Sequence, residues 1–436
     1  MGQEALTGAI QLRKWGNSSM AAESKKSAAL TSPGYLIPFI TVTALFFIFG
    51  FITNLNMALV PHLKAIFTLP YAWAMLAESA FFLAYLVFSS PTSKLIETIG
   101  YKRTMVVSLF IQVVGCLLFV PAAKMVSFPL FLTAVFIVGA GVTALQTSAN
   151  PYVSILGPEG SSSIRLNLAQ AFNSIGGTLA PIVAGAFILT DPAKMATQAA
   201  VANTVRVPYI LIAGALFLLG LALAFMHLPH IESTQEFRPG KEGDPILSRS
   251  IWSYGHTVRG AIGIFFYVGV EVGLASIAVN YFNSQGMSTA KTASFLVSLY
   301  WFGALVGRLL GAGIMTKVKA GKLLGIFGFT AAALIAVSMF TSGWVAIATL
   351  VLCGFFNSVM FPNIFTLGIA GLGPMTSKGS GLIMTAVVGG AVVPYLIGAL
   401  ADRTSIQTSF VIPVICYLYI AYYGMWGHKP DRTITA

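Results

Sequence analysis

Two carboxylates stand well inside apolar stretches of the sequence, Glu78 and Glu271, whereas the other acidic residues lie in tails, in loops or at the ends of such stretches. A carboxylate at the depth of a lipid bilayer is costly unless it is paired, neutralised or turned towards water. Each of the two is therefore a candidate for carrying a proton, holding a cation or accepting a hydrogen bond from a hydroxyl. The structural alternative is a protonated glutamate bonded to a neighbouring helix.

Amide side chains form a second group of polar residues in apolar surroundings. They are Asn54, Asn56, Gln146, Asn150, Gln170, Asn173, Asn280, Asn357 and Asn363. An amide offers both donors and acceptors, which suits a sugar hydroxyl that is also both. Gln146 and Asn150 are four residues apart, so they share one face of a helix. The alternative role is hydrogen bonding between helices, which is common in membrane bundles.

Two aromatic residues in mid-stretch, Tyr267 and Trp301, are candidates for a flat platform. The C–H face of a sugar ring packs on such an aromatic surface. Most of the 32 phenylalanines are expected to face lipid or the core instead. The candidate binding residues are therefore the amides, these two aromatics and Glu271, with Glu78 and Glu271 as candidates for coupling transport to an ion.

The elements that must position these side chains are twelve apolar stretches. They span residues 35–60, 71–95, 104–123, 127–156, 165–190, 206–228, 257–284, 290–314, 322–341, 343–370, 379–401 and 407–426. Most exceed the roughly 20 residues that cross a bilayer as a helix. They lack the alternation of a membrane β-strand, so the sequence predicts an all-α membrane protein.

Composition excludes most other classes. Apolar residues make up 56 % of the 436 residues and charged residues only 9 %. The net charge of +12 is scattered between apolar runs, which argues against a nucleic-acid-binding face. The three cysteines lie singly in apolar runs, and we find no catalytic constellation, metal-binding motif or P-loop. We therefore expect neither an enzyme nor a bound cofactor.

Basic residues set the expected orientation. With the N-terminus cytoplasmic, only six of the 25 Lys and Arg residues fall on the outer side, and the rest, including Arg165 and Arg308, are counted with cytoplasmic loops and tails. We expect a cell (inner) membrane protein with both termini inside. The predicted divisions are a tail at 1–34, a six-helix bundle at 35–228, a linker at 229–256, a second bundle at 257–426 and a tail at 427–436.

The two halves resemble each other weakly. Asn150-Pro151 is followed by Gly157-Pro158 and a later Gly-Gly pair, and Pro362-Asn363 is followed by Gly373-Pro374 and a later Gly-Gly pair. A proline inside a helix removes a hydrogen bond and kinks it. Two kinked helices at matching places predict a duplicated six-plus-six arrangement.

Several motifs resemble one family. They lie at residues 50–56, 61–64, 80–85, 149–152, 156–158, 165–174, 267–272 and 379–382. Together they are similar to the fucose:proton symporter family of major facilitator transporters, especially its glucose/galactose branch, over residues 35–425. The resemblance implies two six-helix bundles that give alternating access to a central sugar site, and it implies that Asn54 and Asn173 contact the sugar.

The departures from the family bear on ion coupling. Where the family has an aspartate linked to proton coupling, this sequence has Met57, and Glu78 stands where the family usually has glutamine. Gln146 matches the hexose branch and replaces a glutamate of the fucose branch. Residues 97–103 resemble a weakened form of the superfamily's acidic–basic gating loop.

We therefore expect a secondary active transporter that imports a monosaccharide, a hexose such as glucose or galactose, coupled to H+ or Na+. The alternatives are an uncoupled sugar facilitator and a transporter of another small polar solute such as an amino sugar. The expected partners are the sugar and the lipid bilayer, and a monomer is expected to suffice.

Overall fold

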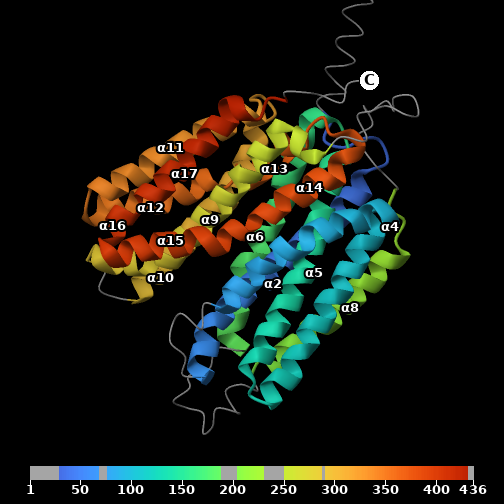
Figure 1. Ribbon diagram of the computed structural model, residues 1–436, viewed down its shortest axis with the longest axis horizontal. Coiled ribbons are helices and arrows are strands. Elements are labelled where there is room, and N and C mark those ends of the chain that lie inside the picture. Colours follow the sequence, from blue (N-terminus) through green and yellow to red (C-terminus); the bar gives the residue numbers. More distant parts are fainter. Residues whose placement is uncertain (1–28, 68–75, 188–203, 230–249, 287–289, 431–436) are drawn as a thin grey trace, which may run out of the picture.

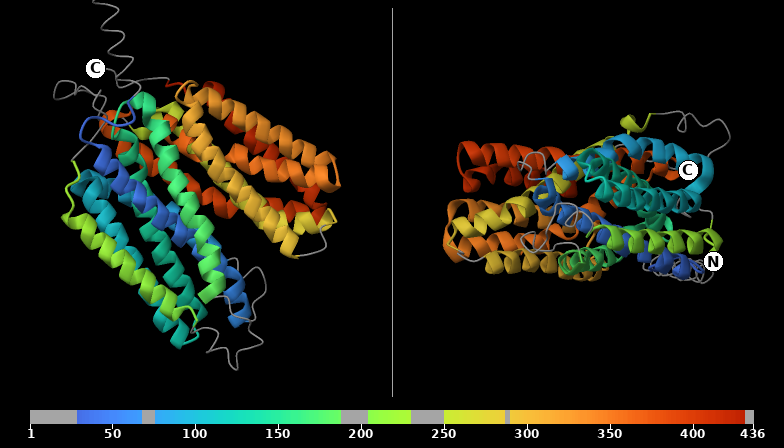
Figure 2. Two further views of the ribbon diagram at one scale, coloured as in Figure 1. Left: turned by 180° about the vertical axis from the view of Figure 1, so that it is seen from behind. Right: turned by 90° about the horizontal axis from the view of Figure 1, so that it is seen from below.

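The computed structural model describes residues 29–67, 76–187, 204–229, 250–286 and 290–430, and every regular element in these ranges is helical. Figures 1 and 2 show two groups of helices side by side. One group contains the described residues before 230, here called the first half. The other contains those from 250 onwards, here called the second half.

The helices of the first half are long. They are α2 (Leu36–Phe67), α4 (Leu76–Lys124), α5 (Phe128–Ile155), α6 (Ser162–Phe187) and α8 (Arg206–Phe225), with the short 3-10 helix η1 (Glu159–Ser161) between α5 and α6. Pro151 lies inside α5, as the sequence predicts.

The second half contains more breaks. Its helices are α9 (Gly255–Ser284), α10 (Ala290–Ile314), α11 (Ala320–Phe340), α12 (Gly343–Asn357), α13 (Met360–Ile369), α14 (Thr376–Thr385), α15 (Gly389–Arg403), α16 (Ile406–Ser409) and α17 (Val411–Tyr422). The predicted stretch 343–370 divides into α12 and α13 at residues 358–359, and α13 begins two residues before Pro362. The stretch 379–401 divides into α14 and α15 at the 3-10 helix η5 (Ala386–Val388).

Helix α4 turns back on itself at Gly100, whose φ of 78° and ψ of 168° only glycine adopts readily. A Cβ on Gly139 of α5 would lie 3.0 Å from the carbonyl oxygen of Phe81. One on Gly141 would lie 2.8 Å from that of Ser108. A straight helix would separate Phe81 from Ser108 by about 40 Å, so both can touch α5 only if α4 folds back.

Ten stretches of the described chain are long and apolar enough to cross a membrane. One of them, Ser79–Lys124, contains the corner at Gly100 and so provides two crossings. Helix α6, which carries more polar side chains, packs along α2 and completes the set of twelve that the sequence predicts.

The halves pack tightly within themselves through glycine. A Cβ on Gly50 of α2 would lie 2.2 Å from the carbonyl oxygen of Asn173. One on Gly176 of α6 would lie 2.1 Å from that of Phe47. Membrane helices approach this closely only where small residues line the contact. The contact therefore fixes α2 against α6 and sets the positions of the polar residues between them.

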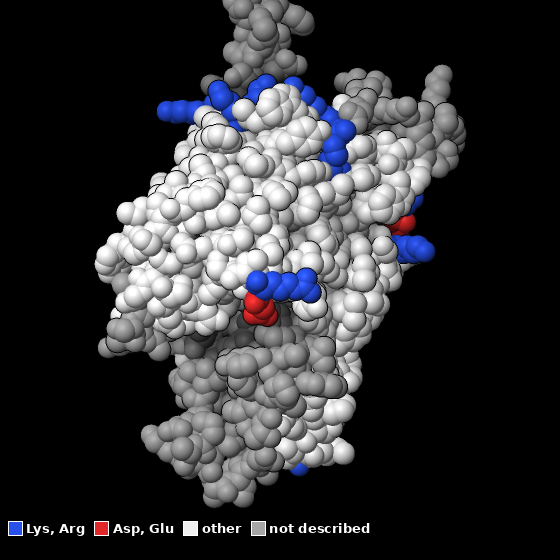
Figure 3. Space-filling view, turned by 60° about the vertical axis from the view of Figure 1, so that its left-hand side comes forward, with Lys and Arg blue, Asp and Glu red and all other residues white. Residues whose placement is uncertain are grey.

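Large apolar side chains such as Phe225, Phe329 and Phe340 are exposed on the outside of the molecule, as lipid contact requires. Figure 3 shows a face on which Lys and Arg gather along one end, above a broad surface nearly free of charge. The structure corrects the sequence analysis at Arg308, which was counted with a loop but lies inside the span Phe295–Ile314 with 6 % of its surface exposed. Arg165 does stand at the connection between α5 and α6, but it is fully buried because its guanidinium group bonds to oxygens of Gly157 and Pro158.

Candidate functional site

Asn54 and Asn173 both lie at the contact between α2 and α6. The Asn54 Nδ2 donates to the Gly50 carbonyl oxygen at 2.9 Å, and the same amide lies against Gly177 of α6. The Asn173 Nδ2 lies 3.5 Å from the Phe46 carbonyl oxygen. Both side chains are half-buried. The glycines bring these two predicted residues onto one contact, where their amides retain donor and acceptor capacity.

Gln146 of α5 is paired with a residue that the sequence analysis did not select. Its Nε2 donates to the Tyr85 hydroxyl at 2.8 Å, and both residues are buried. This bond leaves the Gln146 carbonyl oxygen available as an acceptor. Tyr85 fixes which way the amide points.

Glu271 of α9 is half-buried, and its Oε1 accepts a 2.6 Å hydrogen bond from the Tyr267 hydroxyl one turn earlier. Tyr267 is fully buried, and its ring contacts Phe361 with centroids 6.4 Å apart. Arg308 of α10 acts electrostatically on Glu271. The structure thus groups two predicted residues with a buried cation that the prediction did not include.

Arg308 reaches across to the other half of the molecule. Its Nη1 donates to the Gln170 carbonyl oxygen at 3.0 Å and to the Ser174 hydroxyl, both on α6. A lone arginine in the apolar span Phe295–Ile314 is the signal that could have identified it, because a buried guanidinium is as costly in a membrane as a buried carboxylate.

A seam of polar bonds joins the halves at one end of the molecule. Asn167 of α6 donates to Asn363 of α13 at 2.9 Å, and the hydroxyl groups of Ser163 and Thr366 lie 2.6 Å apart on the same two helices. All four residues are buried. The structure therefore places predicted residue Asn363 between the halves, opposite an asparagine that was not predicted.

Asn150 lies at the same seam, in contact with α14. Its Nδ2 lies 3.6 Å from the thioether sulfur of Met384, and its Oδ1 is buried without a hydrogen-bond partner in the described structure. The Ser380 hydroxyl of α14 donates to the Thr147 carbonyl oxygen at 2.8 Å. A thioether is a weak acceptor, so the Asn150 amide is poorly satisfied although the Ser380 bond joins the same two helices.

The remaining predicted residues are scattered. Asn357 is buried and donates to the Tyr300 hydroxyl at 2.6 Å, and Tyr300 in turn contacts the ring of Trp301 edge-on. Asn280 is exposed near the end of α9. Asn56 and Glu78 lie in helical segments whose side chains are outside the described structure.

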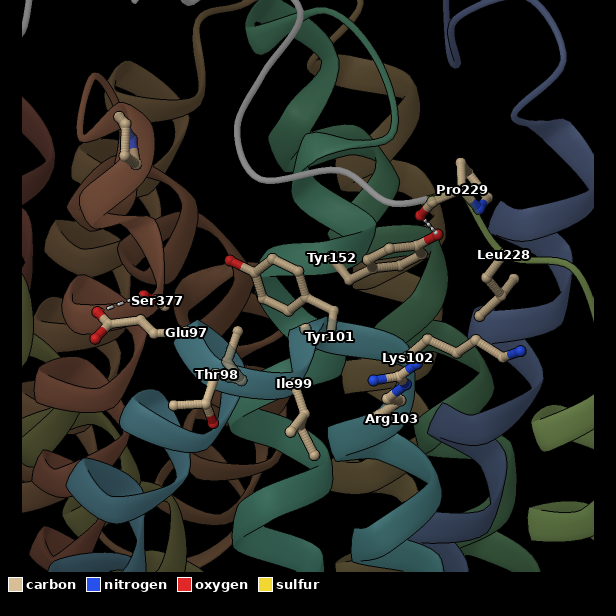
Figure 4. A pocket seen from close by; sticks show the side chains of 13 residues that line it. Glu97, Thr98, Ile99, Tyr101, Lys102, Arg103, Tyr152, Leu228, Pro229 and Ser377 are labelled. Atoms are coloured by element: carbon tan, nitrogen blue, oxygen red, sulfur yellow. Dashed lines mark hydrogen bonds between the residues drawn. The ribbon is translucent and has the colours of Figure 1, made fainter. Parts of the chain in front are cut away.

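A cavity of about 560 Å3 lies at the bonded end, lined by the α4 corner (residues 96–103), Tyr152, Leu228, Pro229, Pro374 and Ser377. Figure 4 shows the side chains that line it. Glu97 points towards Ser377, whose hydroxyl donates to it at 3.1 Å, and Lys378 lies 4.0 Å from the same carboxylate. This is the loop that resembles a gating loop. We call this end, where Glu97 and the Asn167–Asn363 bond connect the halves, the closed end.

Within the described residues, no group of three or more His, Cys, Asp or Glu side chains could hold a metal ion. The cysteines Cys116, Cys353 and Cys416 are buried thiols. The polar groups around Asn54, Asn173 and Glu271 are amides, hydroxyls, one carboxylate and one guanidinium, a set that can exchange hydrogen bonds with a polar solute.

A family model described as the Major Facilitator Superfamily matches residues 41–388. The chain belongs to the Major Facilitator Superfamily. It is 44 % identical over 396 residues to a glucose/galactose transporter of Brucella abortus biovar 1, covering 89 % of this chain and 93 % of that one. It is 32 % identical over 427 residues to the L-fucose-proton symporter of Escherichia coli K12, covering 93 % and 97 %.

Among solved structures, the fold matches the superfamily transporter FucP in its outward conformation with a TM-score of 0.79. The two are 31 % identical, and the match covers 89 % of this chain and 98 % of that chain. The predicted superfamily and its twelve-crossing fold are therefore confirmed. The chain is a multi-pass membrane protein.

Proposed function

We propose that this superfamily member imports a monosaccharide, a hexose such as glucose or galactose, by alternating access. The observation that carries the proposal is the seam: polar bonds such as Asn167–Asn363 and Ser380–Thr147 join two separate groups of helices at one end of the molecule. Its neighbouring amides offer the donors and acceptors that sugar hydroxyls need. The 44 % identity to a glucose/galactose transporter supports the choice of solute.

Counterflow into proteoliposomes tests the solute. Vesicles loaded with unlabelled sugar are given tracer glucose, galactose, fucose, an amino sugar or an amino acid. We expect exchange of a hexose, and loss of at least ten-fold in exchange when Asn173 is changed to alanine. Exchange of an amino sugar alone would select the alternative solute, and exchange of an amino acid but no monosaccharide would overturn the proposal.

We further propose that import is coupled to a cation and that Glu271 binds it, as a proton. Apart from Glu97, which stands beside the corner at Gly100, Glu271 is the one acidic residue of the described chain that lies inside a membrane span away from its ends. Its contact with the Tyr267 hydroxyl is short enough to hold the carboxyl group in place in either protonation state. In this proposal Glu271 takes the part that the absent first-helix aspartate plays in the resembling family.

The test separates coupling from binding. Glu271→Gln is expected to abolish sugar accumulation driven by a pH gradient while sugar exchange remains measurable. A parallel sodium gradient identifies the ion. If the variant still concentrates sugar, Glu271 is not the coupling group, and if the unchanged protein never concentrates sugar, it is a facilitator.

We propose that the protein acts as a monomer in the inner membrane with its closed end at the cytoplasm. Basic side chains support this orientation, since Lys319 and Lys322 flank Ala320, whose carbonyl oxygen accepts from Asn363 at the closed end. A single cysteine in place of Lys319 is expected to react with an impermeant maleimide in inverted vesicles but not in whole cells.

A further inference from the structure

Arg308 is a cation held inside the membrane by neutral oxygens. Its side chain is 6 % exposed, and it lies in the apolar span Phe295–Ile314. In the described part of the chain its hydrogen bonds run to the Gln170 carbonyl oxygen, the Ser174 hydroxyl and the Ser358 carbonyl oxygen. A buried charge of this kind is stable only while such partners surround it.

Two of these three partners belong to the opposite half. Gln170 and Ser174 lie on α6, whereas Ser358 lies at the end of α12, in the same half as Arg308. In alternating access the two halves rock against each other about the binding site. Any movement that withdraws α6 from α10 therefore leaves the guanidinium with a single bond from its Nε, at 3.3 Å, to Ser358.

Glu271 lies on α9, which packs against α10, and its carboxyl group is within electrostatic reach of Arg308. The other ionisable groups that act on Glu271 are Tyr267 on its own helix and Tyr300 on α10. Four more helices pack on α9, namely α13, α14, α15 and α17. The charged side chains that they carry in the described structure are exposed and lie near helix ends: Lys378, Asp402 and Arg403. None of these charged side chains of the described structure therefore lies beside Glu271 in the membrane interior, which leaves Arg308 as the cation that acts on it.

We propose that Arg308 exchanges partners during transport, from the α6 oxygens in the present arrangement to the Glu271 carboxylate once α6 and α10 separate. In the present arrangement the α6 oxygens accept the N–H bonds of Arg308, so Glu271 receives none of them and can hold a proton. After separation the Glu271 O–H bond breaks, its proton leaves to water, and the carboxylate accepts the N–H bonds that α6 has given up. Arg308 is a positioning residue here, and it links proton release to the movement of the halves.

The partner exchange of Arg308 rests on the proposed coupling role of Glu271. The following experiment tests the partner exchange separately from the coupling role. Purified full-length protein in proteoliposomes is assayed for sugar exchange and net sugar efflux from pH 5 to pH 9. The variants are Arg308→Gln, Ser174→Ala, Glu271→Gln and the double variant Arg308→Gln/Glu271→Gln. Thermal unfolding and the apparent affinity for sugar are recorded for each variant.

Removing the guanidinium charge makes it harder for Glu271 to lose its proton, so Arg308→Gln is expected to move the pH profile of net efflux about one pH unit or more towards alkaline pH. Ser174→Ala weakens the hold of α6 on Arg308 and is expected to move the profile towards acid pH. Ser174→Ala keeps all charges, so it also serves if Arg308→Gln fails to fold. The double variant should show the flat profile of Glu271→Gln.

An unchanged pH profile in both Arg308→Gln and Ser174→Ala, beside a flat profile in Glu271→Gln, would overturn the partner exchange and leave the coupling role of Glu271 intact. If Glu271→Gln has the same pH profile of net efflux as the unchanged protein, both the partner exchange and the coupling role of Glu271 are wrong. If Arg308→Gln weakens sugar affinity at every pH without moving the profile, Arg308 binds substrate instead, and the inference is also wrong.

Discussion

Asn167 donates a 2.9 Å hydrogen bond to Asn363, and this bond between two fully buried amides joins helices from opposite halves of the protein. The two residues are 196 positions apart. Neither amide reaches solvent, so the seam must admit water or find other partners before the halves can separate.

Breaking this bond on one side should destabilise the protein. Asn167→Leu or Asn363→Leu alone leaves a buried amide without its partner, which costs about 1–3 kcal/mol. The double variant leaves no such amide and should be less destabilised than the sum of the two. Thermal unfolding in detergent measures each loss, with Asn280→Ala at the exposed end of α9 as the control. Fully additive losses would show that the amides do not interact.

Locking the closed end should stop transport reversibly. The hydroxyl groups of Ser163 and Thr366 lie 2.6 Å apart, so cysteines at both positions are placed to form a disulfide. We expect oxidation of Ser163→Cys/Thr366→Cys to reduce sugar exchange at least ten-fold and a reductant to restore it. Each single cysteine variant is the control, since the native cysteines are buried. Undiminished exchange in the oxidised double variant would mean that this seam stays closed throughout the cycle.

The α2–α6 contact should not tolerate even a methyl group. A Cβ on Gly176 would meet the Phe47 carbonyl oxygen at 2.1 Å, whereas a Cβ on Gly214 of α8 has no atom within 4 Å. Gly176→Ala is expected to lower the free energy of unfolding by about 1–3 kcal/mol through overpacking. Gly214→Ala should be neutral or slightly stabilising. Unfolding in detergent compares them, and equal stability of the two variants would contradict the packing.

Stability should fall in mild acid because of His428. Burial is the main cause that lowers the pKa of this imidazole below its usual 6.5. The unfolded chain then binds a proton at a higher pH than the folded one, so the contribution of His428 is fully present above pH 6.5 and is lost as the pH falls through the lower folded value. The apparent melting temperature between pH 5 and pH 8 should depend less on pH in His428→Gln.

Much of the fold follows from apolar length. The spans of α5, α9 and α11 agree with the predicted stretches to within a few residues, because only a helix satisfies its own backbone in lipid. The corner at Gly100 was expected to be a longer loop. A short break in a polar segment looks the same in sequence whether the chain turns over one residue or over eight.

The site was only partly predictable. Residue type selects Glu271 and the amides as candidates, because polar groups are rare in a membrane and costly without partners. The partners were not predictable, since the pairing of Gln146 with Tyr85 or of Asn363 with Asn167 depends on how distant helices pack. Arg308 was missed because it stands six residues from the end of α10 and was grouped with the loop that follows.

The corner at Gly100 leaves no slack between the second and third crossings. The segments of α4 before and after the corner both pack closely against α5. Glu97, three residues before the corner, accepts a hydrogen bond from Ser377 of the second half. A linkage this short cannot absorb strain by flexing. When the hydrogen bond between Ser377 and Glu97 breaks, the first half has to move at this end as a rigid body, because the corner at Gly100 has no flexible loop to extend.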